Sequence, residues 1–147
     1  MIFIQIIASF VAVAAFSINI DVPKKYIWIV GCAGTIGWLT YLGGIYFKVP
    51  EVLAYFISAL VVAIISMVLS KILNAVSTIF LIPGILPIVP GVAIYKAIYF
   101  FINSSRTEAV HYLIQVLLIT GGIALAIFIT ESIKGIKIIR KERVNEN

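Results

Sequence analysis

The sequence predicts an all-α integral membrane protein with five transmembrane helices, the fourth of which is broken by a Pro/Gly segment. Apolar residues make up 63% of the 147 residues and charged residues only 12%, against roughly 45–50% and 25% in soluble domains. Short polar stretches divide the chain into long apolar runs, and one run holds three prolines and two glycines within nine residues. The surface is therefore expected to face lipid.

The first three spans follow from run length, because a spanning helix needs roughly 20 mostly apolar residues. Residues 2–20 carry no charge and form an uncleaved span, since no Lys or Arg precedes them as in a signal peptide. Residues 26–47 form the second span. Small residues let neighbouring helices approach closely, so Gly31, Gly34 and Gly37 are expected to be helix-packing positions. Residues 52–70 form the third span.

Residues 75–102 form the fourth span, which contains the run Pro83-Gly84-Ile85-Leu86-Pro87-Ile88-Val89-Pro90-Gly91. Each proline removes a backbone donor and disturbs the preceding turn. We expect a half-helix over about 75–82, an irregular segment, and a second helix over 92–101. In lipid, irregular backbone has to be buried in protein or line a wet cavity. A purely structural kink is the alternative.

Residues 110–132 form the fifth span, so residues 1–133 make a single transmembrane domain and residues 134–147 a basic tail. The connections on one side of the membrane and the tail together hold most of the cations: Lys24, Lys25, Lys71, Lys134, Lys137, Arg140, Lys141 and Arg143. The other side holds Lys48 and Arg106. Cytoplasmic loops are rich in Lys and Arg, so we expect the N-terminus outside and the C-terminus in the cytoplasm.

The broken span is the strongest candidate for a functional site. Many transporters bind substrate at discontinuous helices, because a helix that begins inside the membrane directs free N–H groups and a positive dipole end at an anion. The candidate substrate-binding residues are Pro83, Gly84, Pro87, Pro90 and Gly91. Lys96, in the helix that follows, either joins this site as an intramembrane charge or extends its ammonium toward the headgroups.

The sequence predicts neither an enzyme nor a resident cofactor. It contains no paired nucleophile and base and no phosphate-binding loop. Its single histidine, His111, and single cysteine, Cys32, leave no metal-ligand pattern. The positive charge is explained by membrane topology, so no nucleic-acid partner is expected. Glu131, with Lys134 one turn away, is interpreted as an interfacial ion pair, with a proton site as the alternative.

Two motifs resemble those of a known family. Residues Pro83 to Gly91, followed by Tyr95, resemble the signature of the small YjjB-like subunit of the threonine/serine exporter (ThrE) family. Gly34-Thr35-Ile36-Gly37-Trp38 with Tyr41 resembles the second-span pattern of the same family. The resemblance covers essentially the whole chain, and it adds Tyr95 to the candidate substrate-binding residues.

The resemblance implies a secondary transporter in the bacterial inner membrane that exports small hydrophilic amino acids, threonine and serine. It also implies a larger ThrE/YjjP-like membrane subunit as partner, because the other half of the fused relatives is missing here. Two alternatives stay open. The chain is a subunit of a dicarboxylate (succinate) exporter, or it is a non-transporting scaffold that stabilises a partner.

Overall fold

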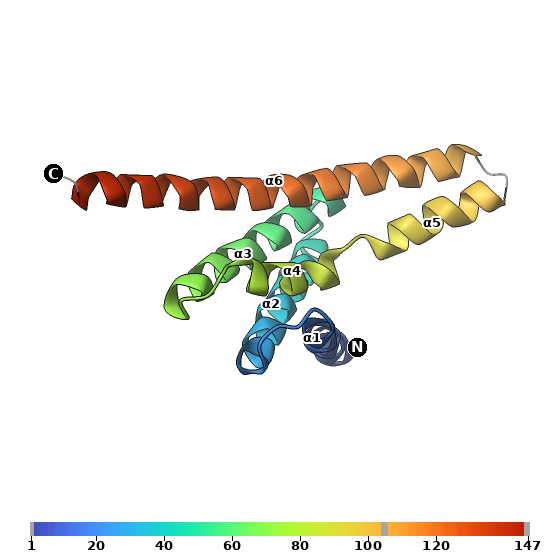
Figure 1. The fold of residues 1–147 in the computed structure, drawn as a ribbon. Coiled ribbons are helices and arrows are strands. Elements are labelled where there is room, and N and C mark those ends of the chain that lie inside the picture. The colour runs from blue at the N-terminus through green and yellow to red at the C-terminus, as the bar shows by residue number, and fades with distance from the viewer. Residues whose placement is uncertain (1, 104–105, 146–147) are drawn as a thin grey trace.

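The computed structural model describes residues 2–103 and 106–145, with side chains as far as Ile133. All described elements are helices (Figure 1). In chain order they are α1 (Ile2–Asn19), the 3-10 turn η1 (Lys24–Tyr26), α2 (Ile27–Tyr46), α3 (Glu51–Ile72), α4 (Thr78–Ile85), the 3-10 turn η2 (Leu86–Ile88), α5 (Gly91–Ile102) and α6 (Arg106–Asn145).

Four helical segments have the length and composition of membrane spans, and a bent pair of helices makes a fifth if its two parts cross as one span. The four are α1, α2 together with η1, α3, and α6 as far as Ile133. The fifth segment is the pair Thr78–Ile88 and Gly91–Ile102, whose two parts are bent by 51°. The predicted all-α membrane fold with a broken fourth span is therefore confirmed, and the chain is a multi-pass membrane protein.

The first three long helices end in the same way. Asp21, Lys48 and Asn74 have φ angles of 57°, 57° and 47°, the left-handed conformation that commonly follows a helix. In each case the next residue donates its N–H back into the last turn: Val22 to Ser17 O (3.0 Å), Val49 to Gly44 O (3.0 Å) and Ala75 to Ser70 O (3.1 Å). This is the Schellman arrangement, and it pairs carbonyls that the end of the helix leaves without an intrahelical partner.

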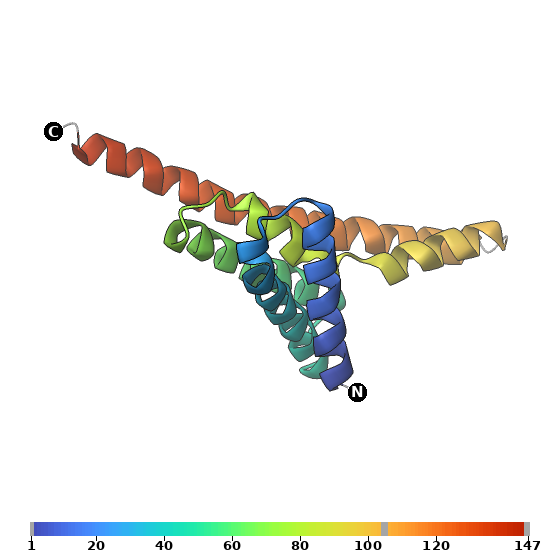
Figure 2. The same ribbon diagram turned by 60° about the horizontal axis from the view of Figure 1, so that its bottom comes forward.

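The helices pack around α2 and α3. Helix α2 lies between α1 and α3, α4 with η2 packs against all three, and α3 packs against α6. Helix α5 packs along the first half of α6, and this hairpin extends away from the other helices in both views (Figures 1 and 2). One buried cluster joins α3, α6 and the broken segment, including Val62, Ile88 and Ile119.

Two connections and part of α6 gather at one end of the molecule, which we call the basic end because it holds Lys24, Lys25 and Lys71. Val22 and Tyr26, between α1 and α2, share a buried cluster with Leu73 and Ala75, between α3 and α4. The Ser77 hydroxyl donates a 3.1 Å hydrogen bond to Glu131 Oε1 and so brings α6 to the same place. The two connections and this part of α6 therefore lie close together at the basic end.

The break lies later in the chain than the sequence predicts. Helix α4 covers Thr78–Ile85 rather than 75–82, so Pro83 and Gly84 are inside it. A residue before proline is biased toward extended backbone, but Leu86, before Pro87, stays helical (φ −48°, ψ −46°). Only Val89, before Pro90, is extended (φ −60°, ψ 131°). Packing of the segment between helices outweighs the local bias at the first two prolines.

Helix α6 also differs from its predicted bounds. It begins at Arg106 rather than at residue 110, and it continues through the basic tail to Asn145. No proline interrupts this stretch, and Lys, Arg and Glu are good helix formers, so nothing in the sequence ends the helix at the membrane surface.

Candidate functional site

Most of the broken segment is enclosed by other helices. Phe80, Pro83 and Ile88 are fully buried, Gly84 and Pro90 are buried, and Pro87 is half-buried. The ring of Tyr26 packs edge-on against Phe80 at 5.3 Å between centroids, which ties the start of α4 to the start of α2. The segment before the bend is thus covered by protein, as a lipid environment favours, whereas Val89 and Gly91 at the bend are exposed.

Glycines let α2 and α3 approach the broken segment. A Cβ added at Gly34 would lie 3.3 Å from the Gly84 carbonyl oxygen, and one added at Gly37 would lie 3.2 Å from Ile88 Cδ1. A Cβ at Gly84 would lie 3.0 Å from Val62 Cγ1 on α3. Gly31 and Gly34 also face α1, where a Cβ would lie 2.6 Å from the Phe10 ring and 2.7 Å from Val13 Cγ2, respectively. Any larger residue would push these elements apart.

The two sequence motifs that resemble the exporter family therefore pack against each other. Gly34 and Gly37, from the second-span motif, contact the Pro83–Gly91 motif through Gly84 and Ile88. On the neighbouring helix, the Ser58 hydroxyl donates a 2.5 Å hydrogen bond to the Gly37 carbonyl. Sequence reasoning treats the glycines and the broken segment as separate features, because a contact between distant segments leaves no local signal.

Trp38 is the residue at this site that sequence reasoning missed. Its indole Nε1 is buried, and no hydrogen-bond acceptor reaches it from the part of the chain that the structure describes. Its ring packs on Tyr41 at 5.2 Å between centroids, and Tyr41 packs on Tyr55 at 4.5 Å. A buried donor without an acceptor is costly in lipid. Its position one turn after Gly34 places it on the same face of α2, but nothing in the sequence indicates that its N–H lacks an acceptor.

Helix α5 begins at the bend without a side-chain cap. Pro90 is its N-cap residue, and the Pro90 carbonyl accepts the N–H of Ile94 at 3.1 Å. The Gly91 N–H donates a 2.7 Å hydrogen bond to the Val89 carbonyl. A Cβ added at Gly91 would have no neighbour within 4 Å. The helix start is therefore open, and its first turn presents the positive end of the dipole.

Tyr95 and Lys96 lie outside the enclosed part of the site. Both are exposed on α5. The Lys96 ammonium lies over the Tyr112 ring of α6, 5.1 Å from its centroid, and Tyr95 stacks on Tyr99 at 6.1 Å. Pro83, Gly84 and Pro90 are therefore buried among the packed helices, whereas Tyr95 and Lys96 lie on the exposed surface of α5.

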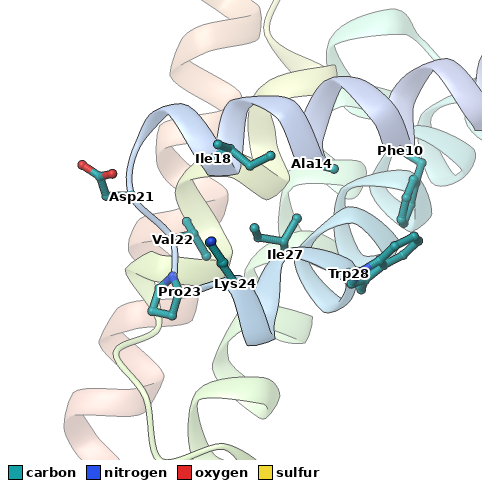
Figure 3. A pocket seen from close by; sticks show the side chains of 9 residues that line it. All are labelled: Phe10, Ala14, Ile18, Asp21, Val22, Pro23, Lys24, Ile27 and Trp28. Atoms are coloured by element: carbon teal, nitrogen blue, oxygen red, sulfur yellow. The ribbon is translucent and has the colours of Figure 1, made fainter.

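Three hollows of the molecule lie elsewhere. One, of about 610 Å³, lies between the end of α1, the connection that follows and the start of α2 (Figure 3). Phe10, Ile18, Ile27 and Trp28 border it, and Asp21 turns away at its edge. Two smaller hollows, of about 470 and 440 Å³, lie between α1 and α2 and between α5 and α6. None of these three is lined by residues 83–91.

Other polar groups tie α6 to its neighbours. Besides the Ser77–Glu131 bond, the Gln115 amide donates a 2.6 Å hydrogen bond to Glu51 Oε2. The side chain of Lys134, expected to pair with Glu131, lies outside the described residues. Within residues 2–103 and 106–145, no group of three His, Cys, Asp or Glu side chains has the arrangement of a metal site.

Comparison with known proteins agrees with the motifs. No curated protein and no solved structure matches this chain significantly. The family model described as "Threonine/Serine exporter, ThrE" matches residues 5–133, which include both motifs and every candidate span except the first three residues of α1. The chain therefore belongs to the threonine/serine exporter family, whose members are transporters rather than enzymes and act on small amino acids.

Proposed function

We propose that this chain is one subunit of a secondary-active exporter of threonine and serine that works with a larger ThrE/YjjP-like membrane subunit. The observation that carries the proposal is the bend at Val89–Pro90. It separates the two helices of the candidate fourth span, and the segment before it is packed against α2 and α3 through glycine contacts. Transporters use such breaks to hold substrate near the midplane.

The start of α5 supplies the binding chemistry in this proposal. Its uncapped first turn directs N–H groups and a partial positive charge at the carboxylate that threonine and serine share. Pro83, Gly84 and Pro87 set the direction of the segment that leads to this turn. Tyr95 and Lys96, on the outer face of α5, contact the substrate only if the larger subunit completes the cavity there.

We also propose a direction of insertion in the membrane. The basic end carries Lys24, Lys25 and Lys71 near the point where α6 leaves the bundle. We place this end and the tail in the cytoplasm and the N-terminus outside, by the positive-inside rule. Export then requires the site to open alternately to the two sides, and substrate shifts that equilibrium only through its different affinity for the two states.

Efflux from preloaded bacterial cells tests the proposal. Cells making this chain alone, the larger subunit alone, both or neither are loaded with threonine, serine and succinate, and the loss of each is followed. The amounts of both proteins in the membrane are measured in parallel. We expect threonine and serine to leave faster than from control cells only when both subunits are present.

Other outcomes assign the chain differently. Succinate efflux without threonine efflux would make it a dicarboxylate exporter subunit with the same architecture. If this chain only raises the amount of the larger subunit, and efflux per larger subunit is unchanged without it, the chain is a scaffold and the transport proposal is wrong.

A further inference from the structure

We propose that the indole N–H of Trp38 donates a hydrogen bond to the carboxylate of the exported amino acid, so that Trp38 is a substrate-binding residue. The inference rests on the proposed function and names a residue of the same site. Its first support is the buried Nε1, which no acceptor of the described residues reaches. Native proteins pair nearly all such groups, and an exception points to a partner from elsewhere.

The position of Trp38 provides the second support. One face of α2 holds Gly34, Trp38 and Tyr41 by helical spacing. Gly34 on this face packs against the Gly84 carbonyl. Gly34 of α2 lies against Gly84, and three residues further along α2, Gly37 lies against Ile88, which is also further along the broken segment. The two segments therefore run in the same direction, and the next residue of α2, Trp38, lies at about the level of the bend at Val89–Pro90.

Chemistry selects the carboxylate as the acceptor. An indole N–H donates and cannot accept, and hydrogen bonds to a charged acceptor are the strongest. Threonine and serine share two acceptors, a carboxylate and a hydroxyl, and the charged carboxylate is the stronger of the two; their ammonium group only donates. The packing of Trp38 on Tyr41, and of Tyr41 on Tyr55, holds the indole ring in one orientation. Carboxylate binding would thus use both the indole N–H and the start of α5.

Transport kinetics provide the first test, with both subunits in proteoliposomes and L-threonine as substrate. Trp38→Phe removes the N–H group and part of the ring. Replacing Trp38 by 3-benzothienylalanine removes only the N–H group and keeps the shape. Both variants should raise KM about tenfold or more, the effect of losing a hydrogen bond to a charged group. Trp28→Phe is the matched control, because Trp28 is 72% exposed on the same helix and its KM should not change.

A direct measurement separates this inference from the choice of substrate. This chain has two tryptophans, so labelling its indole nitrogens with ¹⁵N in a complex with unlabelled partner gives two NMR signals. L-threonine, L-serine and succinate are titrated in turn. The Trp38 indole proton should move downfield with the transported substrate, as expected for a new hydrogen bond, while the Trp28 signal stays in place.

Each result decides a different claim. A shift with succinate alone keeps Trp38 as a carboxylate-binding residue and overturns the threonine/serine proposal. Threonine transport with an unmoved Trp38 signal and an unchanged KM in the benzothienyl variant overturns the inference and leaves the proposed function intact. A Trp38 signal already at the hydrogen-bonded position without substrate also overturns it, because the partner or water then supplies the acceptor. No transport and no shift with any probe overturns both.

Discussion

At Gly37 the backbone of α2 leaves no room for a side chain. An added Cβ would collide with Val62 of α3 and lie 3.2 Å from Ile88 of the broken segment. Both neighbours are fully buried, so neither can move aside without opening the core. The hydrogen bond from the Ser58 hydroxyl to the Gly37 carbonyl holds the same contact from the other helix. The absence of a side chain at Gly37 thus allows α2, α3 and the broken segment to pack closely.

Gly37→Ala is expected to destabilise the protein by about 1–3 kcal/mol, the usual cost of overpacking a close contact. The measurement is the midpoint of thermal unfolding of the purified complex. Gly43→Ala on the same helix is the matched control, because a Cβ there meets nothing within 4 Å. That change should raise the midpoint slightly, since Ala favours helix over Gly by about 1 kcal/mol. Equal midpoints for the two variants would contradict the packing assigned to Gly37.

At the scale of the element, one proline determines where the fourth span bends. Val89 is extended and Pro90 begins α5, whereas Leu86, before Pro87, remains helical. The sequence indicates that this span is broken but not which proline breaks it. All three prolines impose the same local bias, and burial of Pro83 and Gly84 against α2 and α3 decides among them.

Pro90→Ala should therefore affect transport more than assembly. Without the proline ring, Val89 is free to adopt helical backbone and the start of α5 loses its fixed position. We expect the efflux rate per complex to fall about tenfold or more, equivalent to roughly 1.4 kcal/mol in the barrier, with both subunits still present in normal amounts.

Pro50→Ala is the control for this change. Pro50 is the N-cap residue of α3, with an extended ψ of 135°, but it lies outside the broken span. Its replacement should leave efflux per complex unchanged. If both variants export at the wild-type rate, the bend at Val89–Pro90 has no role in transport.

At the scale of the whole molecule, five crossing spans would put the two ends of the chain on opposite sides of the membrane. Residues 20–26 and 73–77 lie at the basic end with Glu131 of α6. Asn103, at the end of α5, belongs to the opposite end if α4 and α5 cross as one bent span. A re-entrant loop would instead return Asn103 to the basic end.

Cysteine labelling distinguishes these topologies. In a Cys32→Ser background, single cysteines are placed at Lys24 and Asn103, both of which are exposed. A membrane-impermeant maleimide applied to intact cells should label the Asn103→Cys variant. It should label the Lys24→Cys variant only after the cells are permeabilised. Labelling of both positions from the same side would rule out a crossing fourth span.

Much of this architecture is readable from composition and run length. The spans over 2–20, 26–47 and 52–70 fall within a few residues of α1, α2 and α3, because lipid thickness fixes how long an apolar run must be. The contacts of Gly34 with Gly84 and of Gly37 with Ile88 could not be predicted from the sequence. They join segments about 50 residues apart, and no local pattern encodes their pairing.

The unpaired Trp38 indole was hidden for the same reason. An aromatic residue in a membrane span is ordinary by itself, and only the absence of an acceptor around its Nε1 marks it as unusual. The length of α6 was missed because the tail was assigned by its charge, whereas its residues favour helix regardless of solvent.

The most direct test of the central claim asks whether substrate occupies the start of α5. Gly91→Cys, in the Cys32→Ser background and with the larger subunit, is reacted with a small soluble thiol reagent in proteoliposomes. Gly91 tolerates a side chain, because a Cβ there meets nothing within 4 Å, and the same is true of the control position Gly43. We predict that Gly91→Cys is labelled and that L-threonine slows its labelling several-fold, while labelling of Gly43→Cys is unaffected. No labelling at Gly91 from either side, or labelling at a rate that threonine, serine and succinate all leave unchanged, would contradict the assignment of the broken fourth span as the substrate site.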